Sequence, residues 1–173
     1  MFVTNHVLSG AVVGQLLKRK PLAAFVVGVG SHLLLDSIPH WGCDGDAPGG
    51  FDRFLRAAVW DGLLGATTML IATASVDRMS RKSTLAAMAG AVLLDLDKPI
   101  FFATGRNPFP DVVQRIHSRI QIESPEGMSN EIRFGLAFAA IDAVTAFSQR
   151  RRRTSNGATP NAATSNGARP PAD

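Results

Sequence analysis

The residues best suited to chemistry lie in one stretch, Ser31–Trp41, which reads SHLLLDSIPHW. His32 and Asp36 are four residues apart, so on a helix they share one face, as in metal sites that take two ligands from one helix. Pro39 ends such a helix and lets His40 turn back toward the same end. Imidazole and carboxylate together suit zinc. The stretch therefore predicts a metal site; the alternative is a polar notch for helix packing, in which unpaired buried groups would cost several kcal/mol.

A second candidate is LLDLDKP, which spans residues 93–99. Asp95 and Asp97 are two residues apart and so do not share a helix face. Pro99 follows closely and favours a helix end, where an irregular backbone could bring both carboxylates to one ion. We predict that both are metal ligands, with an ordinary Asp97–Lys98 ion pair as the alternative.

Three single residues complete the candidate set. His6 lies at the start of the first apolar segment, and we expect it to be a metal ligand. Asp61 and His117 are expected to be a ligand or a general base. Each signal is weak alone, because Asp61 could be a helix-start carboxylate favoured by the helix dipole and His117 could be a surface histidine. Glu131 reads first as a helix-start acid.

The elements that must position these residues are apolar and rich in glycine and alanine. No alternating strand pattern stands out, and runs of this length favour helices. We expect an all-α bundle of about five helices, with Thr4 or Asn5 as the first helix cap. A short amphipathic piece is expected at 111–122. The five segments are 4–17, 22–38, 54–76, 84–97, with a continuation to 103 left open, and 130–147.

Position strengthens the metal-site prediction. In an up-and-down bundle, the first and third segments begin at the pole where the second and fourth end. The candidate histidines and aspartates fall at or near that pole, with His32 about two turns deeper than His40. The basic residues near 18–20, 78–82 and 150–153 fall at the opposite pole. Such convergence is what a polynuclear metal site at a bundle end requires.

Composition bounds the possible functions. Lys and Arg total 18 and Asp and Glu total 14, for a net charge of +4. The excess lies in residues 150–173, so the body is neutral, which argues against a nucleic-acid-binding fold. One cysteine excludes a disulfide scaffold and a four-cysteine zinc site. We expect residues 1–149 to form the helical metal-site domain. The tail at 150–173, where TSNGA occurs twice, is expected to be disordered.

Segments 22–41, 57–76 and 84–104 approach the length needed to cross a bilayer, and 133–147 is marginal. If every segment crosses, the three basic clusters share one side, as the positive-inside rule requires. We therefore predict a protein embedded in the plasma (inner) membrane, with a cytoplasmic tail whose arginines contact anionic lipid. A soluble bundle with its basic residues at one pole is the alternative.

The stretches MFVTNHVLSGAVVG, SHLLLDSIPHW and LLDLDKP resemble a family of small bacterial membrane-bound metal-dependent hydrolases. More distantly the chain is similar to zinc-dependent phospholipase C, an all-helical fold whose zinc ions are held by His, Asp and Glu. The resemblance covers roughly residues 1–122. It is sharpest in the His-x3-Asp-x3-His element, with His6 matching a T-x-H feature and Asp95 and Asp97 a P-D-x-D feature. Leu94 stands where proline is usual, and Lys98 stands where relatives often carry histidine.

The resemblance implies a divalent metal, zinc in the first place, and hydrolysis of a phosphoester such as a phospholipid head group by metal-activated water. The rival hypothesis is a non-enzymatic membrane protein that holds a structural metal or a hydrogen-bond network. Lys98 favours that rival, because an ammonium can neutralise a carboxylate without a metal. The sequence leaves the oligomeric state open.

Overall fold

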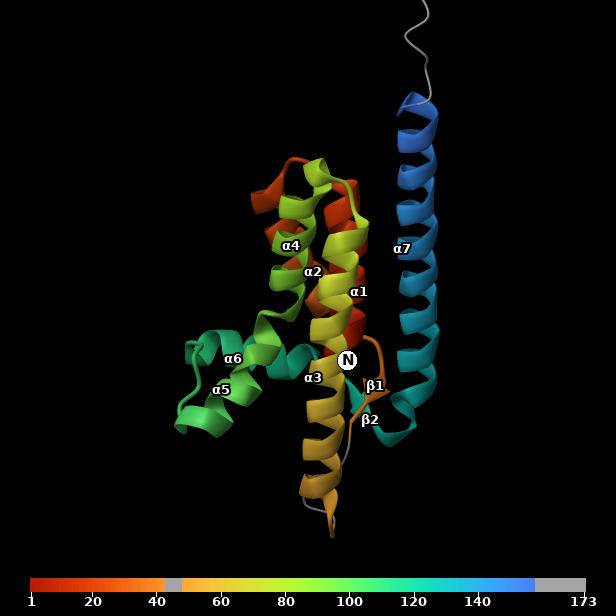
Figure 1. The fold of residues 1–173 in the computed structure, drawn as a ribbon. Helices are drawn as coiled ribbons and strands as arrows, with labels where there is room; N and C mark the ends of the chain where they lie inside the picture. The colour runs from red at the N-terminus through yellow and green to blue at the C-terminus, as the bar shows by residue number, and fades with distance from the viewer. Residues whose placement is uncertain (43–47, 158–173) are drawn as a thin grey trace, which may run out of the picture.

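The computed structural model describes residues 1–42 and 48–157, and within them the chain forms seven α-helices (Figure 1). The all-α prediction is confirmed, and the two helices beyond the expected five are short ones, α5 and α6. The helices are α1 (Val3–Leu16), α2 (Pro21–Asp36), α3 (Gly50–Ser75), α4 (Arg78–Val92), α5 (Asp97–Thr104), α6 (Asp111–Ile120) and α7 (Met128–Gly157).

Helix α4 lies at the centre of the bundle, in close contact with α1 and α2. Glycines make this approach possible. A Cβ at Gly14 of α1 would collide with the backbone of Thr84, and one at Gly28 of α2 would collide with the backbone of Ala87. Small residues let helix backbones approach in this way. The close packing fixes α2, which carries His32 and Asp36, against α4.

The chain changes direction after α4. A 3-10 turn over Leu94–Leu96 separates α4 from α5, which then leaves the bundle with α6 as a side arm (Figure 1). The expected membrane-crossing segment at 84–104 is therefore not one helix. Pro99 explains the break, because its ring would clash with the carbonyl of Asp95 in a continuous α-helix.

Two short parallel strands, which were not predicted, tie the ends of α2 and α6 together. They are β1 (His40–Trp41) and β2 (Glu123–Ser124), with His40 opposite Glu123. The amide of Ile122 also donates to the carbonyl of Asp36, at 3.1 Å. This pairing holds α6 beside the end of α2, although the two are far apart in the sequence.

Helix α7 follows a second 3-10 turn, Pro125–Gly127, and packs along α1. The amide of Gln15 donates to Asp142 at 2.7 Å across this contact. α7 continues past the boundary predicted at residue 149 and ends at Gly157. The remainder of the predicted tail, 158–173, lies outside the described residues.

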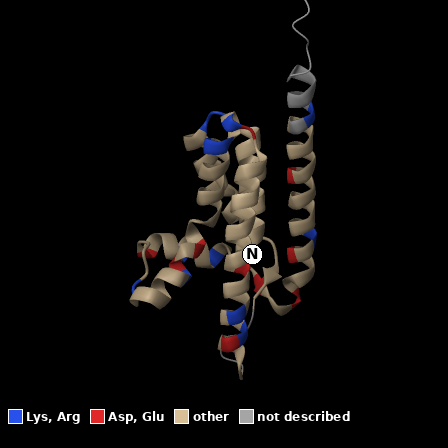
Figure 2. Cartoon of the chain, viewed as in Figure 1, with Lys and Arg blue, Asp and Glu red and all other residues tan. Residues whose placement is uncertain are grey.

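The outward faces of α2, α3 and α7 are unusually apolar. Within the described residues, one helix, α3, is long and apolar enough to cross a membrane. Monomeric soluble proteins rarely expose large contiguous apolar patches. Figure 2 shows long stretches of these three helices without charged residues. The most exposed large apolar side chains on these three helices include Leu22, Leu34, Trp60, Leu70, Leu136 and Val144.

Candidate metal centre

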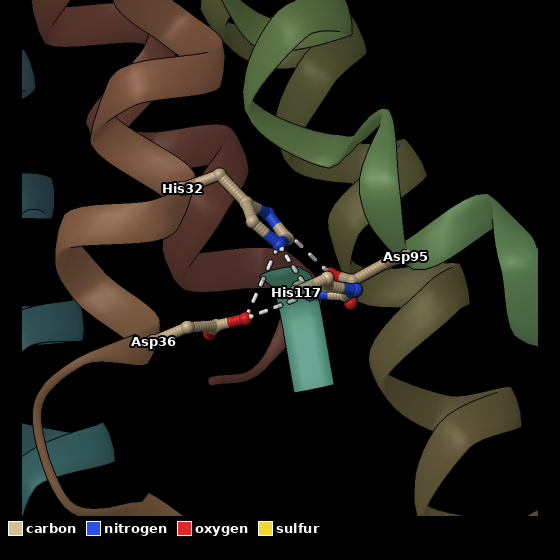
Figure 3. A group of neighbouring side chains, drawn as sticks. All are labelled: His32, Asp36, Asp95 and His117. Atoms are coloured by element: carbon tan, nitrogen blue, oxygen red, sulfur yellow. Dashed lines mark hydrogen bonds and ion pairs between the residues drawn. The ribbon is translucent and has the colours of Figure 1, made fainter. Parts of the chain in front are cut away.

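Four imidazole and carboxylate side chains meet where α2 ends, and Figure 3 shows them pointing toward one another. His32 and Asp36 come from consecutive turns of α2, Asp95 from the 3-10 turn after α4, and His117 from α6. One ligand atom from each lies within 4.8 Å of the others. This group could hold a metal ion, as the sequence predicts.

The contacts within the group have the spacing of metal ligands. Nε2 of His32 and Nε2 of His117 each lie 3.2 Å from Oδ2 of Asp36. The two Nε2 atoms are 3.0 Å apart. Ligands held at about 2.0–2.1 Å from a tetrahedral zinc ion are roughly 3.3 Å from one another. The three atoms therefore need little movement to share one ion.

The backbone fixes the orientation of the His32 ring. Its Nδ1 lies 2.7 Å from the carbonyl oxygen of Ala91. A carbonyl only accepts, so Nδ1 carries a proton, and Nε2 is the ring atom that faces Asp36 and His117. A second proton on the ring or a metal cation between Nε2 and the carboxylate makes this contact favourable. Metal-ligating histidines characteristically donate their other N–H to a carbonyl in this way.

His6, on α1, adds a fifth side chain to the cluster. Its Nε2 lies 3.1 Å from Oδ1 of Asp36 and 3.7 Å from Oδ2 of Asp95, and its ring stacks on that of His32. The side chain is fully buried. Nevertheless, Nδ1 of His6 and Oδ2 of Asp95 have no hydrogen-bond partner among the described residues. Buried polar atoms without partners are rare in native proteins, and a bound ion or water would satisfy these two.

Asp36 is the electrostatic centre of the site and is fully buried. Burial disfavours its charge. The Nε2 atoms of His6, His32 and His117 all lie within 3.2 Å of its oxygens and offset that cost. The amino group of Met1 also contacts Oδ1, at 2.6 Å. The carboxylate is therefore ionised, which is the form that binds a metal.

Two further carboxylates hold the start of α1, and with it His6. Asp61 of α3 accepts the amide of Val3 at 2.5 Å and the amide of Thr4 at 3.1 Å. The backbone amide of Phe2 donates a hydrogen bond to Glu131 of α7, at 3.1 Å. The prediction that Thr4 or Asn5 caps this helix is wrong, because its first N–H groups are already satisfied by carboxylates from other helices.

Glu131 also holds Asn5, whose side-chain amide donates to the carboxylate at 2.6 Å. The carboxylate is buried, and burial raises its pKa although these donors act in the opposite direction. Sequence reasoning gave Glu131 little weight; its signal was an acid directly before an apolar segment.

The structure brings together five of the eight residues singled out in the sequence and places the other three elsewhere. His6, His32, Asp36, Asp95 and His117 converge, whereas Asp61 caps α1. His40 is buried with Nδ1 2.9 Å from the carbonyl of Ile38. Asp97 accepts the amide of Lys98 at 2.6 Å and lines a neighbouring pocket. Their predicted ligand roles stay predictions.

A pocket of about 390 Å³ between α5 and α6 reaches one member of the cluster, His117. His117 forms part of its wall, and Gln121 stands beside it with its amide 3.2 Å from Oδ2 of Asp36. No sequence signal indicated Gln121. Structural zinc sites are closed, whereas catalytic ones keep an open position. The pocket lies on the His117 side of the cluster, where an open position would be reached from solvent.

Lys98 does not neutralise the cluster. Its ammonium lies 4.0 Å from Oε1 of Glu123, and both side chains are exposed. The sequence-based argument for the non-enzymatic rival, an ammonium beside Asp95, therefore loses its structural basis.

Comparison with known proteins adds no family to this description. No protein-family model, curated protein or solved structure matches the chain.

Proposed function

We propose that this protein is a metal-dependent hydrolase in which His6, His32, Asp36, Asp95 and His117 bind a divalent metal, zinc in the first place. The observation that carries the proposal is the buried, unpartnered nitrogen and oxygen atoms of His6 and Asp95 beside the His32–Asp36–His117 contact. Nitrogen and carboxylate-oxygen ligands are a set that zinc accepts.

A bound metal would lower the pKa of a coordinated water and polarise the oxygen of a scissile ester. The chain supplies the remaining elements of the reaction. Ala91 holds the His32 ring with its Nε2 facing the centre. The pocket beside His117 admits the substrate, and Asp97 and Gln121 on its wall can orient a water or an ester oxygen.

The proposed substrate is a phosphoester, in particular one in a phospholipid head group. This rests on the resemblance to phospholipase C and on the apolar outer faces of α2, α3 and α7. A chain embedded in the plasma membrane through these faces would keep its His/Asp cluster near one water boundary. The basic end would face the cytoplasm, by the positive-inside rule.

The proposal is tested with purified full-length protein, stripped of metal by chelation and reloaded with Zn²⁺, Mn²⁺ or Mg²⁺. Release of phosphate or phosphoryl head group is measured on soluble phosphoesters and on phospholipids. We expect hydrolysis that returns with one of the metals and is absent in Asp36→Asn. Metal binding without turnover on any ester would contradict the hydrolase.

The second candidate is a non-enzymatic membrane protein with a structural metal. The full burial of His6, His32 and Asp36 favours it, since such a site would need no access. The two are distinguished by chelation: a structural metal is required for the fold, so its removal would lower the helical content. A catalytic metal would leave the helical content largely unchanged.

A further inference from the structure

A cavity of about 560 Å³ lies at the end of the bundle opposite the metal centre. It lies between the α1–α2 turn and the α3–α4 turn, where Figure 2 shows Lys and Arg side by side on both turns. Neither the sequence motifs nor the proposed hydrolase uses this cavity. Its lining residues are Lys18, Arg19, Asp77, Arg78, Met79 and Arg81.

The cavity carries an excess of positive charge. Its single acid, Asp77, is already engaged: one oxygen accepts the amide of Ser80 at 2.9 Å, and the other lies 3.6 Å from the ammonium of Lys18. The three arginines of the lining form no ion pair with a carboxylate among the residues that the structure describes. Three guanidinium groups around one cavity, none of them in an ion pair with a carboxylate of the described residues, favour an anionic ligand.

The backbone at Arg19 is held in an unfavourable conformation. Its φ of 61° is the one positive value at a non-glycine residue within the described part of the chain. The next amide, that of Lys20, donates to Oγ of Ser83 at 3.0 Å, and that hydroxyl belongs to a buried side chain of α4. Such strain persists where surrounding contacts enforce it, and it is common at binding sites. The turn therefore holds Arg19 at the cavity.

We propose that this cavity binds the phosphate group of an anionic lipid head group through Arg19, Arg78 and Arg81. A guanidinium offers two parallel N–H donors that match phosphate oxygens. Met79, which lines the cavity and is 49% exposed, supplies an apolar contact for the rest of such a ligand. A free phosphate ion would use the same guanidinium groups without needing that apolar contact.

The test measures binding to full-length protein in a neutral detergent. The probes are dioctanoyl phosphatidic acid, dioctanoylglycerol, which has the same chains without phosphate, and inorganic phosphate. The test variant combines Arg19→Gly, in which glycine accepts the positive φ, with Arg78→Gln. The control is Lys82→Gln, because Lys82 is an exposed cation of the same helix turn that does not line the cavity.

We expect phosphatidic acid to bind at least about tenfold more tightly than dioctanoylglycerol, and the double variant to lose about tenfold or more of that affinity. Lys82→Gln should change it by less than about twofold. If inorganic phosphate binds as tightly as the lipid with the same arginine dependence, the ligand is the free ion and the lipid proposal is overturned. Equal binding by the double variant and the wild type overturns the phosphate site itself.

A metal assay on the same samples keeps this inference separate from the hydrolase. The variants lie at the opposite end of the bundle, so their metal content should equal that of the wild type. Loss of metal in the double variant would indicate a general folding defect. The test would then use a second variant, Arg81→Gln. Unchanged affinity of that variant for phosphatidic acid would overturn the proposal.

Discussion

At the end of the bundle where α1 begins and α2 finishes, the ionisable side chains are inside the protein. His6, His32 and Asp36 are fully buried. At the other end, Lys18, Arg19 and their basic neighbours are exposed to solvent. Helices α1 and α2 thus carry buried ionisable side chains at one end of the bundle and exposed ones at the other.

This difference in burial decides whether the charged groups at each end need a bound partner. Exposed cations keep their hydration and cost little, so the basic end is stable without any bound partner. Buried imidazoles and carboxylates lose their hydration and need a replacement for it. Nδ1 of His6 and Oδ2 of Asp95 have no hydrogen-bond partner among the described residues. The proposed metal would supply that replacement at the buried end.

The largest expected effect comes from removing the central carboxylate. Asp36→Asn keeps the volume but removes the charge that faces three histidines. Metal affinity should fall by about a hundredfold or more, since even partners behind metal ligands contribute roughly 10–100-fold. Competition with a fluorescent zinc chelator measures it. Asp52→Asn, an exposed aspartate on α3, is the matched control and should bind as the wild type does. Equal zinc affinity in Asp36→Asn and Asp52→Asn would mean that the buried carboxylate matters no more for metal binding than an exposed one.

A smaller effect is expected between the ends, where α2 lies against α4. Gly28→Ala should destabilise the protein by about 1–3 kcal/mol, because the added Cβ collides with the backbone of Ala87. Gly30→Ala on the same helix meets nothing within 4 Å and should stabilise by about 0.5–1 kcal/mol. Unfolding by SDS titration gives both values. The same sign for the two variants would contradict the described helix contact.

The sequence predicted the helices well because their apolar runs are long. The expected 22–38 became Pro21–Asp36, and the expected 4–17 became Val3–Leu16. It predicted less well where the chain turns. Pro99 suggested a helix end, but the direction of α5 depends on packing that no local pattern encodes.

For the candidate site, spacing along one helix was informative and contacts between helices were not. His32 and Asp36 share a face through local geometry alone. His117 lies 81 residues from Asp36 in the sequence and is brought to it by the β1–β2 pairing. Strands of only two residues leave no pattern that predicts this pairing. Asp61 was predicted to be a ligand or a general base, with a helix-start carboxylate as the alternative. Its partners are the first amides of α1, which only the folded arrangement reveals.

The anchoring of α1 gives a third test. Glu131→Gln removes the charge that accepts the amide of Phe2 and the side chain of Asn5. We expect a loss of about 1–2 kcal/mol in the free energy of unfolding, with a weaker effect on metal affinity than Asp36→Asn. The exposed Glu126 provides the control, as Glu126→Gln. Unchanged stability in Glu131→Gln would mean that these hydrogen bonds do not hold α1 in place.

The smallest effect is expected at Lys98. Its ammonium lies near Glu123 and is exposed, so Lys98→Gln should alter zinc affinity by less than about twofold. The same chelator competition measures it. A large gain in affinity would show instead that Lys98 competes with the metal for the carboxylates, which would revive the non-enzymatic rival.

The most direct test of the buried end is X-ray absorption spectroscopy at the zinc edge on full-length protein, with elemental analysis of the same sample. We expect at least one zinc per chain, bound by imidazole nitrogens and carboxylate oxygens at about 2.0–2.2 Å with no sulfur. A folded, fully helical protein that neither contains nor takes up a divalent metal would contradict it.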